Sequence, residues 1–231
     1  MEKLDLRLAA AADFVKEGTV AADVGTDHGY IPIYLVQTGK SEKAFAMDVN
    51  DGPLLRAKEH IAEYGLSEKI EVRLSDGVRA LTPGECDGVV VAGMGGALAI
   101  KIMEEGETVF RNLKEFVLQP QSELTKVRQY LYENDYCVIA EDMVLEDGKF
   151  YPMMKVINGK SSAYSLVELR YGKRLLEQKH PVLFMYLDKE VKTKENILQN
   201  LKSESGEHIH KRMKELEEEI LYAKKALEVY L

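Results

Sequence analysis

The sequence is poor in cysteine and has no long hydrophobic run. Its two cysteines, Cys86 and Cys137, are far apart and lie beside strand-like segments, which is typical of core or edge residues rather than of a disulfide or metal site. No apolar run approaches the roughly 20 residues that a membrane-spanning helix needs. The charged start, Met1-Glu2-Lys3, does not resemble a secretory signal. We therefore expect a cytoplasmic protein without a membrane partner.

The sequence also lacks the patterns of several enzyme classes. No His, Cys and Asp residues show metal-ligand spacing, so no metal is expected, and no Ser-His-Asp arrangement is suggested. A G-x-G-x-x-G fingerprint is missing as well, because Gly25 and Gly29 stand four apart with Asp27 and His28 between them. Asp27 would put a negative charge where a dinucleotide brings its pyrophosphate. A cationic or zwitterionic ligand such as S-adenosylmethionine (SAM) suits this turn better.

A net positive charge is absent too, although the charge is unevenly spread. The 231 residues carry a formal net charge of −8, with −10 in residues 1–159 and +2 in residues 160–231. A polyanion would meet less repulsion at the C-terminal part, which permits an RNA partner without indicating one. The length allows one α/β core with an appendage.

Strand-like and helix-like segments alternate through the first two thirds of the chain. Predicted helices at about 2–16, 29–38, 51–64, 96–105 and 123–134 are interleaved with predicted strands at 19–24, 43–48, 70–74, 87–92 and 115–118. Two further strands, 136–145 and 149–157, are joined through Asp147-Gly148, a strong hairpin signal. This pattern predicts a doubly wound, mostly parallel seven-stranded α/β sheet of the Rossmann-like kind that class I SAM-dependent methyltransferases share.

The composition changes after Gly159. One helix is expected at 164–178, and two longer ones at about 182–201 and 208–231 are separated by a break at 203–206. Their apolar residues are surrounded by charged ones, which predicts an antiparallel, coiled-coil-like helical hairpin too thin for a core of its own. We therefore expect a catalytic domain at 1–159 and a helical extension at 160–231.

Carboxylates close three successive predicted strands. Asp23, Asp48 and Asp76 each stand at a carboxyl end, where ligands bind in doubly wound sheets. Asp48 can accept hydrogen bonds from both ribose hydroxyls of an adenosine, and Asp76 from an adenine amino group, with Gly77 leaving room for the ring. A single Asp in such a place is often only a helix cap. Three aspartates, each at the carboxyl end of a successive predicted strand, favour an adenosine-containing ligand.

The turn Gly93-Met94-Gly95-Gly96 follows the fourth predicted strand. Its glycines open a flat slot, and Met94 can pack against an adenine face or simply into the core. His28 is the only histidine expected near the site, and it serves equally well as a helix-start residue or as a substrate contact.

Taken together, these segments closely resemble the bacterial tRNA (adenine-22-N1)-methyltransferase family. The resemblance covers residues 1–157, and the helical hairpin is similar to that family's C-terminal coiled coil. One departure is Gln121, where the family pattern has Asn. The motifs that carry the resemblance are Arg7-Leu8, Val24-Gly25-Thr26-Asp27-His28-Gly29-Tyr30, Asp51-Gly52-Pro53, Asp76-Gly77 and Ala92-Gly93-Met94-Gly95-Gly96-Ala97.

The resemblance implies SAM as methyl donor, tRNA as partner and a set of site residues. Residues expected to bind the cofactor are Asp23, Gly25, Thr26, Gly29, Asp48, Val49, Asp76, Gly77, Gly93 and Met94. Residues expected to bind the substrate are Arg7, His28, Tyr30, Gly95, Gly96, Gln119 and Gln121. A monomer is favoured.

Asp27 is the expected catalytic residue. Adenine N1 is a weak nucleophile, and methylation makes the base cationic, so a carboxylate that accepts a hydrogen bond from N6 would stabilise the developing charge. Tyr30 or Met94 would stack on the flipped base. Two alternatives stay open at this point: a SAM enzyme for a small metabolite, which the acidic first domain suits, and a protein that binds SAM without transferring its methyl group.

Overall fold

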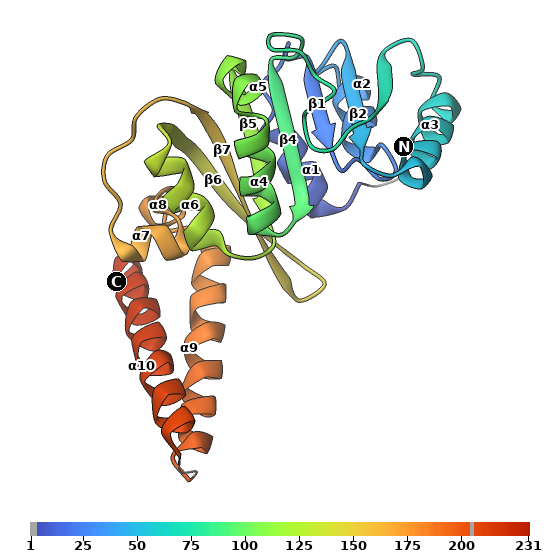
Figure 1. Cartoon of the computed structure of the whole chain (residues 1–231). Coiled ribbons are helices and arrows are strands. Elements are labelled where there is room, and N and C mark those ends of the chain that lie inside the picture. The colour runs from blue at the N-terminus through green and yellow to red at the C-terminus, as the bar shows by residue number, and fades with distance from the viewer. Residues whose placement is uncertain (1–3, 204–205) are drawn as a thin grey trace. The chain divides into compact units, whose positions relative to one another are not determined.

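The computed structural model describes residues 4–203 and 206–231. The chain forms two compact units, the first ending at Ser162 and the second beginning at Ala163. The first unit is built on one seven-stranded sheet of order β3-β2-β1-β4-β5-β7-β6 (Figure 1). Strands β1 to β5 are parallel, and β7 is antiparallel to both β5 and β6. The predicted doubly wound, mostly parallel sheet is confirmed. Its strands are β1 Ala21–Val24, β2 Ala44–Asp48, β3 Ile70–Leu74, β4 Gly88–Met94, β5 Glu115–Pro120, β6 Tyr136–Glu146 and β7 Lys149–Asn158.

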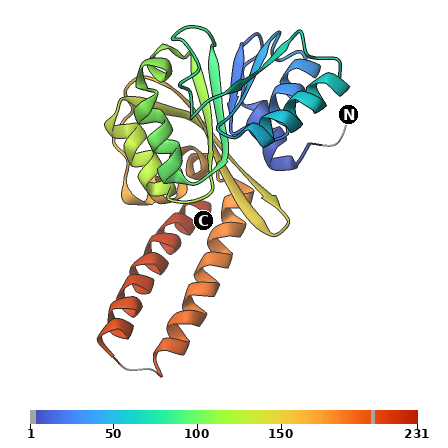
Figure 2. The same cartoon turned by 45° about the vertical axis from the view of Figure 1, so that its right-hand side comes forward.

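Helices cover both faces of the sheet, as the two sets of coils in Figure 2 show. Successive side chains of the central strand β4 point to opposite faces of the sheet, and both faces need cover because both sets of side chains are apolar and buried. Val90 packs with Leu35 under the first set of helices, and Val91 packs with Met103 and Phe110 under the second. The first set is α1 Leu6–Asp13, α2 Tyr30–Gln37 and α3 Asp51–Glu63, and the second is α4 Gly96–Glu105, α5 Glu107–Asn112 and α6 Leu124–Glu133.

The first helix is shorter than the predicted 2–16. The start of the predicted range overlaps residues outside the described ranges. The observed helix ends at Asp13, where two lysines distant in the sequence bind the carbonyls of Asp13 and Phe14. Lys40 Nζ donates to the carbonyl oxygen of Asp13 at 3.0 Å, and Lys155 Nζ donates to that of Phe14 at 2.8 Å. These partners replace further helical turns.

The second unit is a helical hairpin with two short helices before it. The single helix predicted at 164–178 is wrong, because Gly172 takes a φ of 93° and separates α7 Leu166–Tyr171 from α8 Lys173–Glu177. The long helices α9 Pro181–Leu201 and α10 Glu207–Leu227 then run side by side in opposite directions (Figures 1 and 2), followed by the short 3-10 turn Glu228–Tyr230. The predicted break at 203–206 includes two residues outside the described ranges.

Apolar side chains along α9 and α10 are buried between them, among them Leu187, Leu216 and Ala223. Lys194 and Glu219 add an ion pair across the two helices at 2.9 Å. The hairpin is therefore present, whereas its coiled-coil geometry stays a prediction. Within the described ranges, none of the helices combines the length and apolar character that a bilayer crossing requires.

Candidate active site

A pocket of about 260 Å³ lies at the carboxyl ends of β1 and β4. These two strands are neighbours at the point where the strand order reverses, which is where doubly wound sheets bind ligands. The predicted site residues that line this pocket are Arg7, Asp23, Gly25, Thr26, Asp27, His28, Tyr30 and Gly93. Asp5, Leu8, Ile31 and Ala92 also line it; none of them was a predicted site residue, although Leu8 and Ala92 belong to the motifs of the family resemblance. The other predicted residues lie outside this lining: Gly29, Asp48, Val49, Asp76, Gly77, Met94, Gly95, Gly96, Gln119 and Gln121.

The turn after β1 depends on its two glycines. Gly25 and Gly29 have φ values of 75° and 74°, a region that side chains disfavour, and Gly29 directly precedes α2. The amides of Gly25 and Thr26 both donate to the carbonyl of Met47 on β2. The methyl group of Met94 occupies the place where a side chain on Gly25 would stand. The turn thus fits closely against both neighbouring strands.

Two carboxylates are buried at the ends of β1 and β2. Asp23 is 4% exposed and Asp48 is 8% exposed, and neither forms an ion pair with another described residue. Burial raises the pKa of Asp23 from 3.8 to about 7, against a lowering contribution from the Thr26 side chain and with a smaller raising contribution from the neighbouring Asp48 carboxylate. Asp48 accepts a hydrogen bond from the amide of Asn50 at 2.9 Å. A cationic ligand beside this pair would favour the ionised form of Asp23.

The residues expected at the adenine end lie after β2 and β3. Val49 is 59% exposed and is thus free to contact a ligand ring. The Asp76 carboxylate pairs with Arg79 at 3.6 Å. Gly77 has a φ of 61°, and a Cβ there would lie 3.1 Å from Ile102 of α4. The space that Gly77 frees is therefore used for packing on α4.

Asp27 is held by an arginine that was not predicted from the sequence. Arg56 Nη2, on α3, donates a hydrogen bond to Oδ1 of Asp27, while His28 Nε2 lies 3.7 Å from Oδ2. Asp27 has a φ of 44°, which is uncommon for a residue with a side chain and turns the carboxylate toward α3 and the pocket. Its side chain remains 56% exposed, so the carboxylate can still accept a hydrogen bond from a ligand.

Three rings gather beside Asp27. The ring centroid of His28 lies 5.2 Å from that of Tyr30 and 5.2 Å from that of His60, with interplanar angles of 13° and 27°. His60 Nδ1 also lies 3.1 Å from the carbonyl oxygen of His28. His60 and Arg56 were both missed, although their four-residue spacing on the helix after β2 places them on one face and gave a usable signal.

On the β4 side, Gln119 fixes the glycine turn. Its Oε1 accepts a hydrogen bond from the Gly93 amide at 2.8 Å. Strand β4 continues beyond the predicted 87–92 because Met94 pairs with Pro120 after a register shift at Gly93. Gln119 is 1% exposed, and its Nε2 has no hydrogen-bond partner among the described residues. The Gln121 amide donates to the Met94 carbonyl at 2.8 Å. The guanidinium of Arg7 lies 5.5 Å from the centre of the Tyr151 ring.

Gly95 and Gly96 begin α4. A Cβ on Gly96 would lie 2.5 Å from the Ser122 carbonyl and 2.9 Å from Val127, so this glycine permits close packing on the β5–α6 loop. One on Gly95 would meet the Ser122 hydroxyl at 3.3 Å. Within the described ranges, no three His, Cys, Asp or Glu side chains are grouped to hold a metal ion.

Comparison with known proteins shows the family to which the chain is similar. The sequence model of the family described as tRNA (adenine(22)-N(1))-methyltransferase matches residues 21–225. The tRNA (adenine(22)-N(1))-methyltransferase of Bacillus subtilis is 37% identical over 171 residues, which span 74% of this chain and 72% of that protein.

Two solved structures extend the similarity to nearly the whole chain. The crystal structure of the Bacillus subtilis M1A22 tRNA methyltransferase has a TM-score of 0.87 at 30% identity and covers 98% of this chain and 100% of its own. The Streptococcus pneumoniae protein Sp1610, solved in complex with S-adenosyl-L-methionine, has a TM-score of 0.87 at 31% identity and covers 97% of this chain and 100% of its own.

Proposed function

The chain belongs to the tRNA (adenine(22)-N(1))-methyltransferase family, and we propose that its β1–β4 pocket transfers a methyl group from SAM to N1 of adenine 22 in tRNA. It is a SAM-dependent tRNA methyltransferase by family. The observation that carries the assignment of the site is that the exposed Asp27 carboxylate lines the same pocket as the buried Asp23 carboxylate, which has no ion-pair partner among the described residues. The family favours this function over methylation of a small metabolite and over binding of SAM without transfer.

The residues at the ends of β1 and β2 fit a cationic cofactor. Asp23 and Asp48 are buried without an ion-pair partner among the described residues, and a ligand ammonium or sulfonium group would compensate their charge. We assign Asp23 and the 25–29 turn to the amino-acid end of SAM, and Asp48 and Val49 to its ribose and adenine. Asp76 and Gly77 complete the adenine end. Bound SAM supplies an electrophilic methyl group, which bonds to adenine N1 as the electrons of its C–S bond return to sulfur.

Asp27 acts on the substrate side. Its carboxylate accepts a hydrogen bond from the adenine N6 amino group, which stabilises the positive charge that N1 methylation places on the base. Arg56 occupies Oδ1 and leaves Oδ2 beside the ring of His28, whose Nε2 lies 3.7 Å away, and both Asp27 and His28 line the pocket. Arg56 thereby orients the carboxylate for this contact.

The remaining predicted substrate residues surround the base. Tyr30 and His28 provide ring faces on which an unstacked adenine can lie, offsetting part of the few kcal/mol that flipping the base costs. Arg7 brings positive charge to the pocket. Gln119 lies behind the pocket lining and has in its Nε2 a donor without a partner among the described residues. Gln121, Gly95 and Gly96 shape the turns on the β4 side.

We assign catalysis to the first unit and tRNA binding to the second, whose helical hairpin carries the less acidic part of the chain. The protein acts in the cytoplasm, where its tRNA substrate is found. The monomeric state that the sequence favours stays a prediction.

The test is a transfer assay with methyl-labelled SAM. Unmodified tRNA with adenine at position 22 should take up label as N1-methyladenosine, and the same tRNA with guanine at that position should take up none. Label in a small-metabolite extract, or equal labelling of the two tRNAs, would contradict the proposal.

A further inference from the structure

The connection between β3 and β4 carries the Asp76-Gly77 turn but has no helix of its own. Residues 75–87 form turns that lead from the edge strand β3 to the centre of the sheet. Val78 and Leu81 anchor the connection in the core, being 1% and 5% exposed. Without a helical hydrogen-bond ladder, the exact position of the turn between these anchors depends on side-chain contacts.

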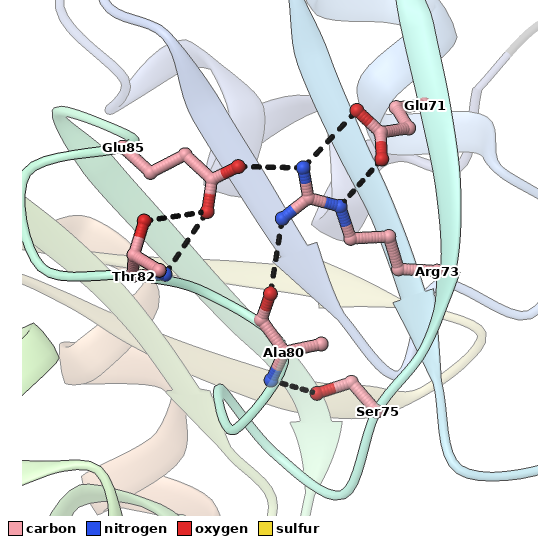
Figure 3. Close-up of polar contacts among 6 residues, drawn as sticks. All are labelled: Glu71, Arg73, Ser75, Ala80, Thr82 and Glu85. Atoms are coloured by element: carbon pink, nitrogen blue, oxygen red, sulfur yellow. Dashed lines mark hydrogen bonds and ion pairs between the residues drawn. The ribbon is translucent and has the colours of Figure 1, made fainter.

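Arg73 on β3 supplies the largest set of those contacts (Figure 3). Its Nε and Nη2 donate to the two carboxylate oxygens of Glu71 at 2.7 and 3.1 Å. Nη2 also donates to Glu85 at 2.6 Å, and Nη1 donates to the carbonyl of Ala80 at 3.0 Å. The guanidinium lies 4.3 Å from the centre of the Phe45 ring on β2. Arg73 thus joins the sheet to two points of the connection through the planar fork that only arginine has.

The contacts continue to both sides of the Asp76-Gly77 turn. The Ser75 hydroxyl donates to the Gly77 carbonyl at 2.8 Å and accepts from the Ala80 amide at 3.1 Å, so Ser75 and Arg73 hold the same peptide segment. Glu85 accepts from the amide and hydroxyl of Thr82 at 2.9 and 3.2 Å. The Arg73 guanidinium, with help from Thr82, lowers the pKa of Glu85 to about 2, which keeps this partner ionised at any pH used for assay.

We infer that Arg73 is a positioning residue for the cofactor: it holds the Asp76-Gly77 turn where the adenine of SAM is recognised. This inference rests on the proposed function, because that function places the adenine at this turn. Loss of Arg73 should leave the buried anchors Val78 and Leu81 in place and loosen the turn between them. The consequence is weaker SAM binding with little change in the methyl-transfer step or in tRNA binding.

The experiment compares Arg73→Met and Arg73→Lys with the wild-type protein in calorimetric titrations with SAM and in steady-state assays. Lysine keeps the charge and can pair with a glutamate, but it cannot bridge Glu71, Glu85 and Ala80 together. Both variants should raise the Kd and KM of SAM roughly tenfold, with Arg73→Lys the milder, while kcat at saturating SAM and the KM of tRNA stay within about twofold. If Arg73→Met does not fold by circular dichroism, Arg73→Lys carries the test.

A matched control is Arg111→Met, because Arg111 also pairs with a glutamate, Glu107 at 3.4 Å, and lies 4.2 Å from the centre of an aromatic ring, that of Tyr136. It should leave the Kd of SAM unchanged. An Asp76→Ala background supplies the second check: if Arg73 acts through the turn, adding Arg73→Met to it should raise the Kd by less than twofold.

An unchanged SAM Kd in folded Arg73→Met, an additive loss in the double variant, or an equal loss in kcat and tRNA KM would each overturn the inference. Wild-type protein that bound no SAM would instead overturn the proposed function on which the inference rests.

Discussion

Arg56 of α3 donates a hydrogen bond to the carboxylate of Asp27, a residue of the β1–α2 turn that has a φ of 44°. Both side chains remain about half exposed, at 45% and 56%, so the pair contributes at most about 1 kcal/mol to stability. The pair matters instead for the orientation of the Asp27 carboxylate. The bond occupies one oxygen of Asp27 and fixes how the other faces the pocket.

We therefore expect Arg56→Ala to reduce kcat by roughly three- to tenfold, with an unchanged Kd for SAM and a melting temperature within a few degrees of wild type. Steady-state kinetics and thermal unfolding measure these quantities. Lys114→Ala is the control, because it removes another exposed ion pair of the first unit, with Asp87 at 2.6 Å, away from the pocket lining. A kcat equal to wild type in Arg56→Ala would mean that Asp27 needs no orientation by Arg56.

SAM binding should be linked to the release of a proton from Asp23. In the free protein the pKa of Asp23 is about 7, and a bound cation would lower it because the ionised carboxylate is then favoured. Affinity for SAM should thus rise with pH, by about tenfold between pH 6 and pH 8. Titration calorimetry at both pH values measures this dependence.

The matched variant for this prediction is Asp23→Asn, which cannot release a proton. It should bind SAM more weakly than wild type at pH 8 and show a flat pH dependence. An equally steep pH dependence in Asp23→Asn would assign the proton to another group.

Gly25→Ala should impair the turn in two ways. The new methyl group would meet the Met94 methyl, and alanine disfavours the φ of 75° at this position. Gly148→Ala isolates the second effect, because Gly148 has a φ of 74° and nothing within 4 Å of an added Cβ. We expect a loss of roughly 1 kcal/mol in unfolding free energy for Gly148→Ala and a larger loss for Gly25→Ala.

Urea unfolding measures both losses, and SAM titration should show weaker binding for Gly25→Ala alone. Met94→Ala, placed in the Gly25→Ala background, should recover the part of the loss that comes from the clash. Equal losses for the two glycine variants would show that Met94 yields freely.

The helical hairpin offers a prediction for tRNA binding. Lys202, Lys211 and Lys214 are exposed near the turn between α9 and α10, and phosphate contacts by such residues make binding weaken steeply with salt. Changing all three to alanine should raise the KM of tRNA, reduce the salt slope by about one for each lysine that binds a phosphate, and leave the Kd of SAM unchanged. Filter binding over a salt series tests this. An unaltered slope would remove these lysines from the RNA-binding surface.

Much of the fold could be predicted from the sequence because short β-prone runs alternate with amphipathic helical segments, and some of these runs are wholly buried. Ala44–Asp48 is the clearest case, with all five residues buried. Long-range partners explain the differences. Lys40 and Lys155 bind the carbonyls at the end of α1, and β4 is extended by the pairing of Met94 with Pro120 on β5, interactions that no local pattern encodes.

The residues of the candidate site also divide into those that a local pattern predicts and those that depend on contacts distant in the sequence. Asp23 follows from its place at the end of a strand and Asp27 from the turn after it, whereas the arginine that orients Asp27 comes from helix α3, 29 residues later. Gly96 was predicted to bind substrate, and its closest neighbours, Ser122 and Val127, instead point to packing. Its role toward substrate stays a prediction.

The catalytic role of Asp27 is tested most sharply by the kinetics of its variants on tRNA. We predict that Asp27→Ala binds SAM and tRNA nearly as wild type does but transfers the methyl group roughly 10²-fold more slowly or worse in single turnover, because charge stabilisation on the N6 side is removed. Asp27→Asn keeps an acceptor oxygen without the charge, and its rate of methyl transfer should fall between those of the wild type and Asp27→Ala. A large loss of SAM affinity would place Asp27 on the cofactor, and wild-type turnover by Asp27→Ala would contradict its catalytic role outright.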